Sequence, residues 1–163
     1  MTDESFQRGQ QWLEQLLQRS GLSASVSVNH ERSQSEGSCW LEIDESALSP
    51  EQIHHVIGDK GHTLDAVQYL CNTILNLGQS SDEQQAFTVE LNGYRAQRQA
   101  ELQSMAENIA EQVRQTGEQQ ELTGLSSAER RQVHTLLKDQ TDLTTESVGR
   151  EPDRRLVVRL AES

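Results

Sequence analysis

Aromatic residues are scarce in this sequence, and their scarcity limits what the chain can do. Phe, Trp and Tyr together make up 4% of the 163 residues, and proline and cysteine occur twice each. Few aromatic rings leave few platforms on which nucleic-acid bases could stack. The hydrophobic fraction of 33% still allows a thin, mostly aliphatic core, so the chain is expected to fold rather than to stay disordered.

Long apolar runs and a secretory signal are also missing from the sequence. We therefore expect a soluble, cytoplasmic protein with no membrane association. Cys39 and Cys71 stand alone, without CxxC spacing. In a reducing compartment such thiols are usually small buried hydrophobic residues rather than a disulfide or a metal site, and we expect no cofactor.

Positive charge is in short supply and unevenly placed. The chain has 14 basic against 26 acidic residues, a net charge of −12. Residues 1–95 hold 5 basic and 14 acidic residues, a balance of −9, whereas residues 96–163 hold 9 and 12, a balance of −3. Since nucleic acids are bound largely through Lys and Arg, any such binding is expected mainly in the second part.

The first 93 residues predict the element order αββααβ. Apolar spacing indicates a helix over 6–19, and alternation indicates two strands over 24–30 and 39–45, joined as a hairpin by a polar turn. A capping box at Ser49 to Gln52 opens a helix that ends at Gly58. A second helix over 64–75 and a strand over 87–91 follow.

Residues 94–163 predict a second, smaller α/β domain with an antiparallel sheet, so that the whole chain is of the α+β class. An amphipathic helix over 94–115 precedes a short strand at 119–123. Ser126 and Glu129 form a second capping box that opens a helix, and two strands over 143–148 and 155–160 close the chain.

A GxxG loop formed by Gly58, Asp59, Lys60 and Gly61 joins the two helices of the first domain. Glycines let a phosphate backbone approach closely, and the following helix presents free N–H groups at its positive end. A bare glycine-bounded turn would have the same sequence. Its place within the αββααβ order favours a nucleic-acid-binding loop.

The helix opened by Ser126 carries a cationic face. At about 100° per residue, Arg130, Arg131, His134 and Lys138 fall in one sector, and an apolar sector lies beside it. The apolar sector contains Val133, Leu136 and Leu137. The alternative is an ordinary solvated helix face with no ligand.

Three separate motifs resemble the bacterial Jag-family (KhpB-type) proteins. They are the stretch from Val56 to Tyr69, the Arg130-x-x-x-His134 pair, and the run from Thr144 to Arg155 with its TES-x-G-x-EP-x-RR pattern. The residues Asn92 to Arg95 are similar to the start of the family's long helix. The resemblance implies a type II KH-like domain over 1–93 and an Arg-x-x-x-His domain over 94–163, without the N-terminal Jag domain of many members.

The resemblance also implies roles for individual residues. Arg130 and His134 would contact phosphate or a terminal nucleotide, and Arg131 and Lys138 would widen the patch. Further binding residues implied by it are Arg150, Arg154 and Arg155 in the second domain and Gly58, Asp59, Lys60 and Gly61 in the first. RNA is the implied ligand, and a homodimer or a heterodimer with a small KH-domain protein is the implied assembly.

No motif indicates catalysis, and His54, His55 and His62 lack the spacing of a metal site. We therefore expect a binding protein for single-stranded RNA or RNA ends, acting as a post-transcriptional regulator or RNA chaperone. The alternative is a protein-interaction adaptor with weak RNA affinity, because Asp59 stands where the family usually has a basic residue. RNA binding should weaken as salt rises and require Arg130 and Arg131, whereas an adaptor should not depend on them.

Overall fold

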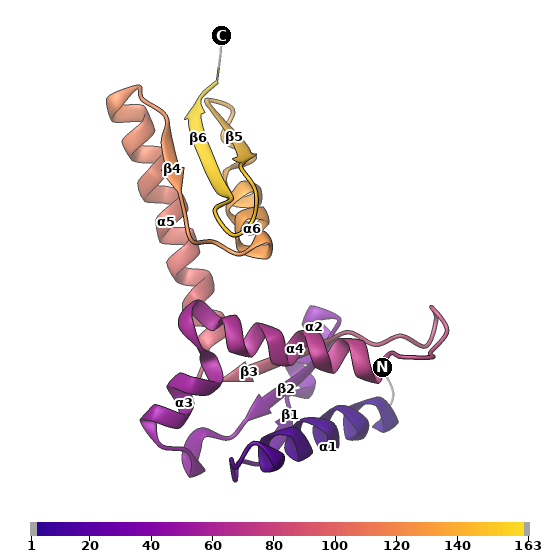
Figure 1. Ribbon diagram of the computed structural model, residues 1–163. Coiled ribbons are helices and arrows are strands. Elements are labelled where there is room, and N and C mark those ends of the chain that lie inside the picture. The colour runs from indigo at the N-terminus through magenta and orange to yellow at the C-terminus, as the bar shows by residue number, and fades with distance from the viewer. Residues whose placement is uncertain (1–2, 162–163) are drawn as a thin grey trace. The chain divides into compact units, whose positions relative to one another are not determined.

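The computed structural model describes residues 3–161, which fold into two compact units divided between Arg95 and Ala96 (Figure 1). Both units combine helices with a small three-stranded sheet, so the α+β class expected from the sequence is confirmed. Within the described residues no helix is both long and apolar enough to cross a membrane.

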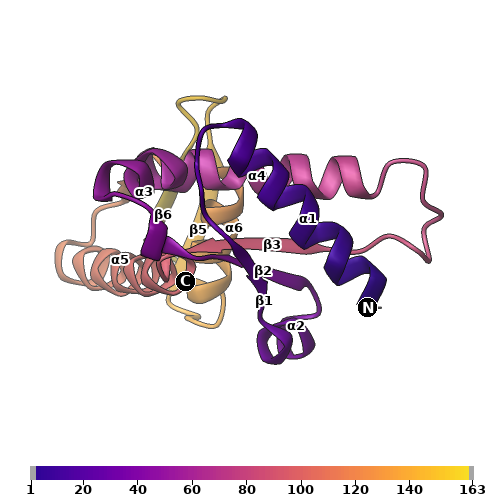
Figure 2. The ribbon, with the colours of Figure 1, turned by 90° about the horizontal axis from the view of Figure 1, so that it is seen from below.

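The first unit follows the predicted order with one added helix. Its elements are α1 (Asp3–Arg19), β1 (Val26–Val28), α2 (His30–Glu36), β2 (Cys39–Ile43), α3 (Pro50–Ile57), α4 (His62–Leu75) and β3 (Phe87–Leu91). Short 3-10 turns at Glu45–Ala47 and Asp59–Gly61 precede α3 and α4. The sheet order is β1-β2-β3, with β1 antiparallel and β3 parallel to β2. Helices α1 and α4 lie over this sheet (Figure 2).

Helix α2 replaces the polar turn that we expected between the first two strands, and that expectation was wrong. The side chain of Asn29 accepts a hydrogen bond from the Arg32 amide at 3.0 Å, which caps the helix, and Gly37 ends it with a φ of 68°. The Arg32 guanidinium then lies 4.5 Å from the ring centre of Trp40. This stacking gives a largely polar helix a packing partner that its composition did not reveal.

Aliphatic side chains from both layers of the first unit form its core. They include Leu13 of α1, Leu41 of β2, Leu64 of α4 and Val89 of β3, all fully buried. Cys39 and Cys71 belong to this core as free thiols, as the sequence predicted. Burial raises the pKa of both thiols to about 12.

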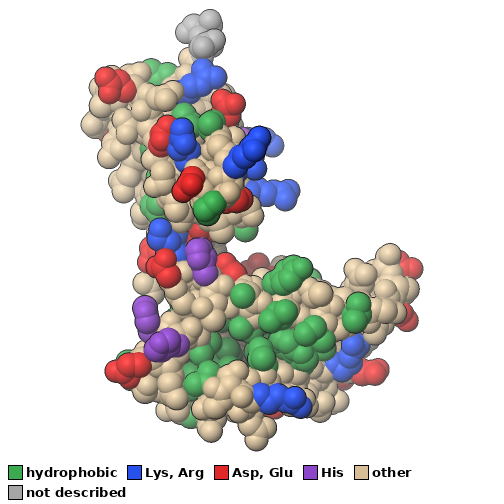
Figure 3. Space-filling view, in the orientation of Figure 1, with side chains coloured by type: hydrophobic (Ala, Val, Ile, Leu, Met, Phe, Trp, Pro, Cys, Tyr) green, Lys and Arg blue, Asp and Glu red, His purple; other side chains and the backbone are tan. Residues whose placement is uncertain are grey.

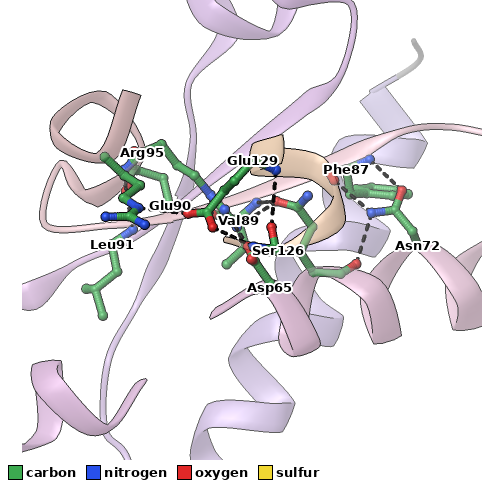
Figure 4. A network of polar contacts seen from close by, with 11 residues as sticks. Asp65, Asn72, Phe87, Val89, Glu90, Leu91, Arg95, Ser126 and Glu129 are labelled. Atoms are coloured by element: carbon green, nitrogen blue, oxygen red, sulfur yellow. Dashed lines mark hydrogen bonds and ion pairs between the residues drawn. The ribbon is translucent and has the colours of Figure 1, made fainter. Parts of the chain in front are cut away.

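A polar network closes the first unit where its last strand leads into the long helix (Figure 4). The Arg95 guanidinium contacts Asp65 at 2.5 Å and donates to the Gln68 side chain at 3.1 Å. The buried Glu90 carboxylate accepts from the amide of Leu91 at 2.7 Å and from that of Arg95 at 3.2 Å. These bonds satisfy a carboxylate that burial would otherwise penalise.

The second unit contains most of α5 (Tyr94–Thr116), then β4 (Gln120–Leu122), α6 (Ser127–Leu137), β5 (Leu143–Val148) and β6 (Arg155–Leu160). The strands form an antiparallel sheet in the order β4-β6-β5, as the sequence predicted. Its core is aliphatic, with Leu102 and Val113 of α5, Val133 of α6 and Val158 of β6 buried together.

Candidate nucleic-acid interface

A groove of about 350 Å³ lies on the second unit between α6 and the β5–β6 hairpin. Cationic and hydroxyl side chains share its lining with one aliphatic residue. The lining residues are Ser127, Arg130, Arg131, His134, Thr145, Ser147, Arg154 and Leu156. Guanidinium, imidazole and hydroxyl groups are the side-chain donors that bind phosphate and sugar oxygens.

The start of α6 is fixed by the capping box that the sequence predicted. The Ser126 hydroxyl accepts from the Glu129 amide at 3.2 Å, and the Glu129 carboxylate accepts from the Ser126 amide at 2.8 Å (Figure 4). Arg98 of α5 donates to the same carboxylate at 2.7 Å. Burial raises the pKa of the Glu129 carboxyl, but the bonds from Arg98 and Ser126 outweigh it and hold that pKa below its usual value.

Two exposed side chains of α6 form one wall of the groove. Arg131 and His134 are three residues apart and therefore lie on the same helix face. The His134 ring shares a hydrogen bond through Nδ1 with the Thr145 hydroxyl on β5. This contact orients the ring toward the hairpin side of the groove.

The hairpin supplies the opposite wall. Thr145 and Ser147 are two residues apart on β5, so their side chains point to the same side of the sheet. Arg154, just before β6, donates from Nε to the Ser147 hydroxyl at 2.8 Å. Our prediction of site residues missed both hydroxyls, although strand alternation within 143–148 could have indicated them.

Arg130 does not share the exposed position of its neighbours. Its side chain is 4% exposed, and it lies on the buried face of α6 with Val133 and Leu137. Leu136, which we expected on the apolar face, is 39% exposed. The long apolar stem of arginine can pack in a core when its guanidinium finds acceptors, and a helical pattern does not reveal them.

The acceptors of Arg130 all belong to this chain. Nη1 donates to the Leu125 carbonyl at 2.6 Å and to the Arg154 carbonyl at 3.3 Å. Nη2 pairs with the carboxylate of Glu151 in the turn between β5 and β6. The guanidinium is thus engaged by the protein itself, and it borders the groove from behind its surface.

Three other predicted cations lie outside the groove lining. Lys138 is exposed at the end of α6, and Arg150 is exposed in the turn before β6. The Arg155 side chain lies beside β4, with its Nε 2.9 Å from the Glu121 carboxylate. The structure therefore brings together Arg130, Arg131, His134 and Arg154 of the predicted set.

The glycines of the GxxG loop are required by their own surroundings. Gly58 has a φ of 73° and Gly61 a φ of 78°, a region that favours glycine. A Cβ atom on Gly58 would lie 2.2 Å from the Thr63 hydroxyl, and one on Gly61 would lie 2.5 Å from the Tyr94 ring. Local packing alone thus explains both glycines.

The two residues between these glycines, Asp59 and Lys60, are exposed. The amides of Gly58 and Gly61 donate to the carbonyls of His54 at 2.8 Å and of Gly58 at 3.3 Å. These two amides are therefore used within the loop region rather than offered to a ligand. A role for the loop in binding stays a prediction.

His54, His55 and His62 lie on either side of the GxxG loop, in α3 and at the start of α4. Among residues 3–161, no group of three or more His, Cys, Asp or Glu side chains is arranged to hold a metal ion. The His55 ring instead hydrogen-bonds through Nδ1 to the Glu51 carbonyl at 2.7 Å, one helical turn earlier.

Comparison with known proteins bears on the second unit directly. Residues 100–160 match the Arg-x-x-x-His (R-three-H) domain family, and this range contains every residue of the groove. Three bacterial relatives, each named RNA-binding protein KhpB, are similar over longer stretches. The chain is thus similar to KhpB proteins over most of its own length and to the Arg-x-x-x-His domain family over most of its second unit.

The three relatives differ in how much they share with the chain. The protein from Clostridium symbiosum is 29% identical over 150 residues, which cover 92% of this chain and 64% of the relative. Those from Lactiplantibacillus plantarum and Bacillus subtilis are 34% and 30% identical over 105 and 113 residues. These matches cover 64% and 68% of this chain but 32% and 53% of the relatives, so the chain spans less than two thirds of each KhpB relative.

Proposed function

We propose that this chain is of the KhpB/Jag type and binds single-stranded RNA or RNA ends through the groove of its second unit. The observation that carries the proposal is the convergence of Arg131, His134 and Arg154 with two strand hydroxyls around one groove. The names of the KhpB relatives and the match to the Arg-x-x-x-His domain family support it. In this proposal the protein binds RNA without catalysis and acts in the cytoplasm as a post-transcriptional regulator or RNA chaperone.

Phosphate recognition is the central step of this mechanism. The guanidinium groups of Arg131 and Arg154 attract the backbone and can bind phosphate oxygens in pairs. The hydroxyls of Thr145 and Ser147 add donors of the kind that contact phosphate and ribose. Because each contact releases counterions, affinity should fall as salt rises, by a slope of about 0.7 per phosphate for a single strand.

Fluorescence anisotropy with a short labelled single-stranded RNA tests the proposal. The wild-type chain should bind at low salt and lose affinity as salt rises. Arg131→Ala should weaken binding about tenfold, because a hydrogen bond to a charged group contributes about 1.5–3 kcal/mol. It should also reduce the salt slope by about 0.7.

Arg114→Gln provides the matched control. Arg114 belongs to the second unit and carries the same charge, but it pairs with Asp142 at 2.6 Å and does not line the groove. Its loss should change RNA affinity far less than the loss of Arg131. Equal effects of the two variants would mean that general charge, rather than the groove, determines binding.

A second function, protein interaction through the first unit, has an observation of its own. Helix α4 and the turn that follows it expose large hydrophobic side chains, and hydrophobic residues gather over the first unit in Figure 3. These residues and their exposed fractions are Tyr69 (69%), Leu70 (43%), Ile74 (48%) and Leu77 (80%). We propose a small KH-domain protein as the partner, because the resemblance implies this assembly and clustered apolar side chains are typical of interfaces.

Analytical ultracentrifugation separates this function from RNA binding. After nuclease treatment, a Tyr69→Ser/Leu77→Ser variant should lose association with a small KH-domain protein while keeping its RNA affinity. Arg131→Ala should have the opposite pattern. Association that disappears with nuclease alone would show that RNA, rather than the α4 surface, joins the two proteins.

A further inference from the structure

Arg130 joins two segments that are distant in sequence. The Leu125 carbonyl, which its Nη1 contacts at 2.6 Å, lies just before the cap of α6. The Glu151 carboxylate and the Arg154 carbonyl belong to the turn between β5 and β6. One guanidinium therefore ties the beginning of α6 to the turn of the hairpin.

Burial makes Arg130 a poor direct ligand for RNA. Its side chain is 4% exposed, whereas the side chain of its partner Glu151 is 58% exposed. A phosphate that took the place of Glu151 would satisfy one of the three acceptor positions, but the two carbonyl contacts would keep the guanidinium in place. A buried arginine is tolerated in the folded protein only while its hydrogen-bond acceptors remain.

Arg154 is the groove residue that depends on this tie. Its backbone carbonyl accepts from Arg130 at 3.3 Å, and its side chain donates to the Ser147 hydroxyl at 2.8 Å. The first contact fixes the backbone, and the second directs the guanidinium along the groove. A side chain held at both ends loses less conformational freedom when it binds a ligand.

We propose that Arg130 is a positioning residue, which together with Glu151 holds the β5–β6 turn so that Arg154 faces the groove. This inference rests on the proposed function of the groove, and it assigns Arg130 a role other than the phosphate contact implied by the family resemblance. RNA then meets Arg131, His134 and Arg154, while Arg130 stays behind them.

Glu151→Gln distinguishes the two roles by the sign of its effect. If Arg130 binds phosphate itself, Glu151 competes with RNA, and its neutralisation should strengthen binding. If Arg130 positions the turn, the same change weakens the tie and should reduce RNA affinity by about fivefold, even though a negative charge is removed.

Asp153→Asn is the matched control for charge. Asp153 is exposed in the same turn, and its carboxylate is not among the groups bonded to Arg130. The Asp153→Asn substitution removes the same charge and leaves the Arg130–Glu151 contact in place, so RNA affinity should stay equal or rise slightly. The difference between the two variants isolates the contribution of the Arg130–Glu151 contact.

A double-mutant cycle with Arg154→Ala tests whether the effect passes through Arg154. Glu151→Gln should weaken RNA binding in the wild-type background and have little further effect in the Arg154→Ala background. A loss of equal size in both backgrounds would contradict the proposal, because it would indicate a general structural defect. Melting temperatures of all four proteins show that the affinities refer to folded protein.

Hydrogen–deuterium exchange gives a readout that does not need RNA. Amides of residues 149–155 should exchange faster in Glu151→Gln than in Asp153→Asn. Tighter RNA binding by Glu151→Gln, or unchanged exchange in the turn, would overturn the positioning role. If the wild-type chain binds no RNA at all, the proposed function fails instead, so the two failures are distinguishable.

Discussion

The two units differ in charge and in aromatic content. All six aromatic residues lie within residues 1–95, which carry a charge of −9, whereas residues 96–163 contain none and carry −3. The second unit therefore offers no Phe, Tyr or Trp ring on which bases could stack, and its contacts with RNA would be mainly to phosphates and sugar hydroxyls. The grouping of cations around one groove, rather than the net charge of either unit, is what favours the second unit as the RNA-binding part.

The arginines of the second unit differ in whether they are paired with a carboxylate. Four of its described arginines are paired with carboxylates, namely Arg98, Arg114, Arg130 and Arg155. Arg154, by contrast, contacts a neutral hydroxyl and keeps its charge uncompensated by that bond. A phosphate approaching the groove thus meets guanidinium charge without first displacing a carboxylate from Arg154.

The largest expected effect comes from removing the groove cations together. Arg131→Ala/His134→Ala/Arg154→Ala should weaken binding of a short single-stranded RNA by about 1,000-fold, since each lost contact is worth about tenfold. Asp59→Lys in the loop of the first unit should change affinity by only a few fold, because an exposed charge is strongly screened. Anisotropy titrations at physiological salt make the comparison.

The opposite ranking of these two effects would indicate that RNA binds mainly to the first unit. If Asp59→Lys raised affinity more than the triple substitution lowered it, the GxxG loop would be the principal contact. Circular dichroism of both variants serves as the control for folding.

Arg130→Ala should have the next largest effect, on stability rather than on contact with RNA. It leaves two backbone carbonyls and the Glu151 carboxylate without their donor, a loss of about 2–4 kcal/mol in the free energy of unfolding of the second unit. Arg131→Ala, at an exposed position of the same helix, should change it by about 0.5 kcal/mol or less.

The distribution of tryptophan allows each unit to be followed separately. Trp12 and Trp40 both lie in the first unit, so their fluorescence reports its unfolding, whereas far-ultraviolet circular dichroism reports both units. In urea, Arg130→Ala should shift the circular dichroism transition and leave the fluorescence transition in place. A shift of both signals would mean that the units do not unfold independently.

Local features of the fold could be predicted from the sequence because their causes are local. The capping boxes at Ser49 and Ser126 and the two closing strands depend on residues within a few positions of one another, and the structure confirms them. Helix α2 was missed because its stabilising contact, between Arg32 and Trp40, joins a polar segment to a strand.

The site was predictable in its residue types but not in their roles. Periodicity grouped Arg130 with Arg131 and His134, yet the acceptor Glu151 lies 21 positions away, and only the folded hairpin brings it near. The hydroxyls of Thr145 and Ser147 likewise join the groove through strand pairing and the packing of α6 against β5. Such long-range contacts decide which cation is exposed and which is buried.

Acid should destabilise the second unit through Glu129 and Asp142. Hydrogen bonds from Arg98 and Ser126 outweigh burial and lower the pKa of Glu129, and the bond from Arg114 lowers that of Asp142. Both contributions are fully present above the ordinary pKa values of 4.5 and 3.8, and they are lost as the pH falls through the lower folded values.

Glu129→Gln isolates this effect. The range from about pH 6 to about pH 3 includes the ordinary pKa values of carboxyl groups. Over this range the stability of the Glu129→Gln variant, measured by circular dichroism, should depend less on pH than that of the wild type. Glu118→Gln, at an exposed site of the same unit, should keep the wild-type dependence. An unchanged profile for Glu129→Gln would show that the bond from Arg98 contributes little to the folded state.

The smallest effect is expected at the two thiols, and it tests the independence of the units most directly. Burial raises the pKa of Cys39 and Cys71 to about 12, so few thiolates exist near neutral pH and access is blocked as well. Reaction with Ellman's reagent should therefore require opening of the first unit.

Because both thiols lie in that unit, Arg130→Ala should leave the labelling rate unchanged even though it destabilises the second unit. Leu13→Ala, which removes a fully buried side chain of α1 from the core of the first unit, should raise the labelling rate instead. A similar rise in Arg130→Ala would mean that the stability of the first unit depends on that of the second.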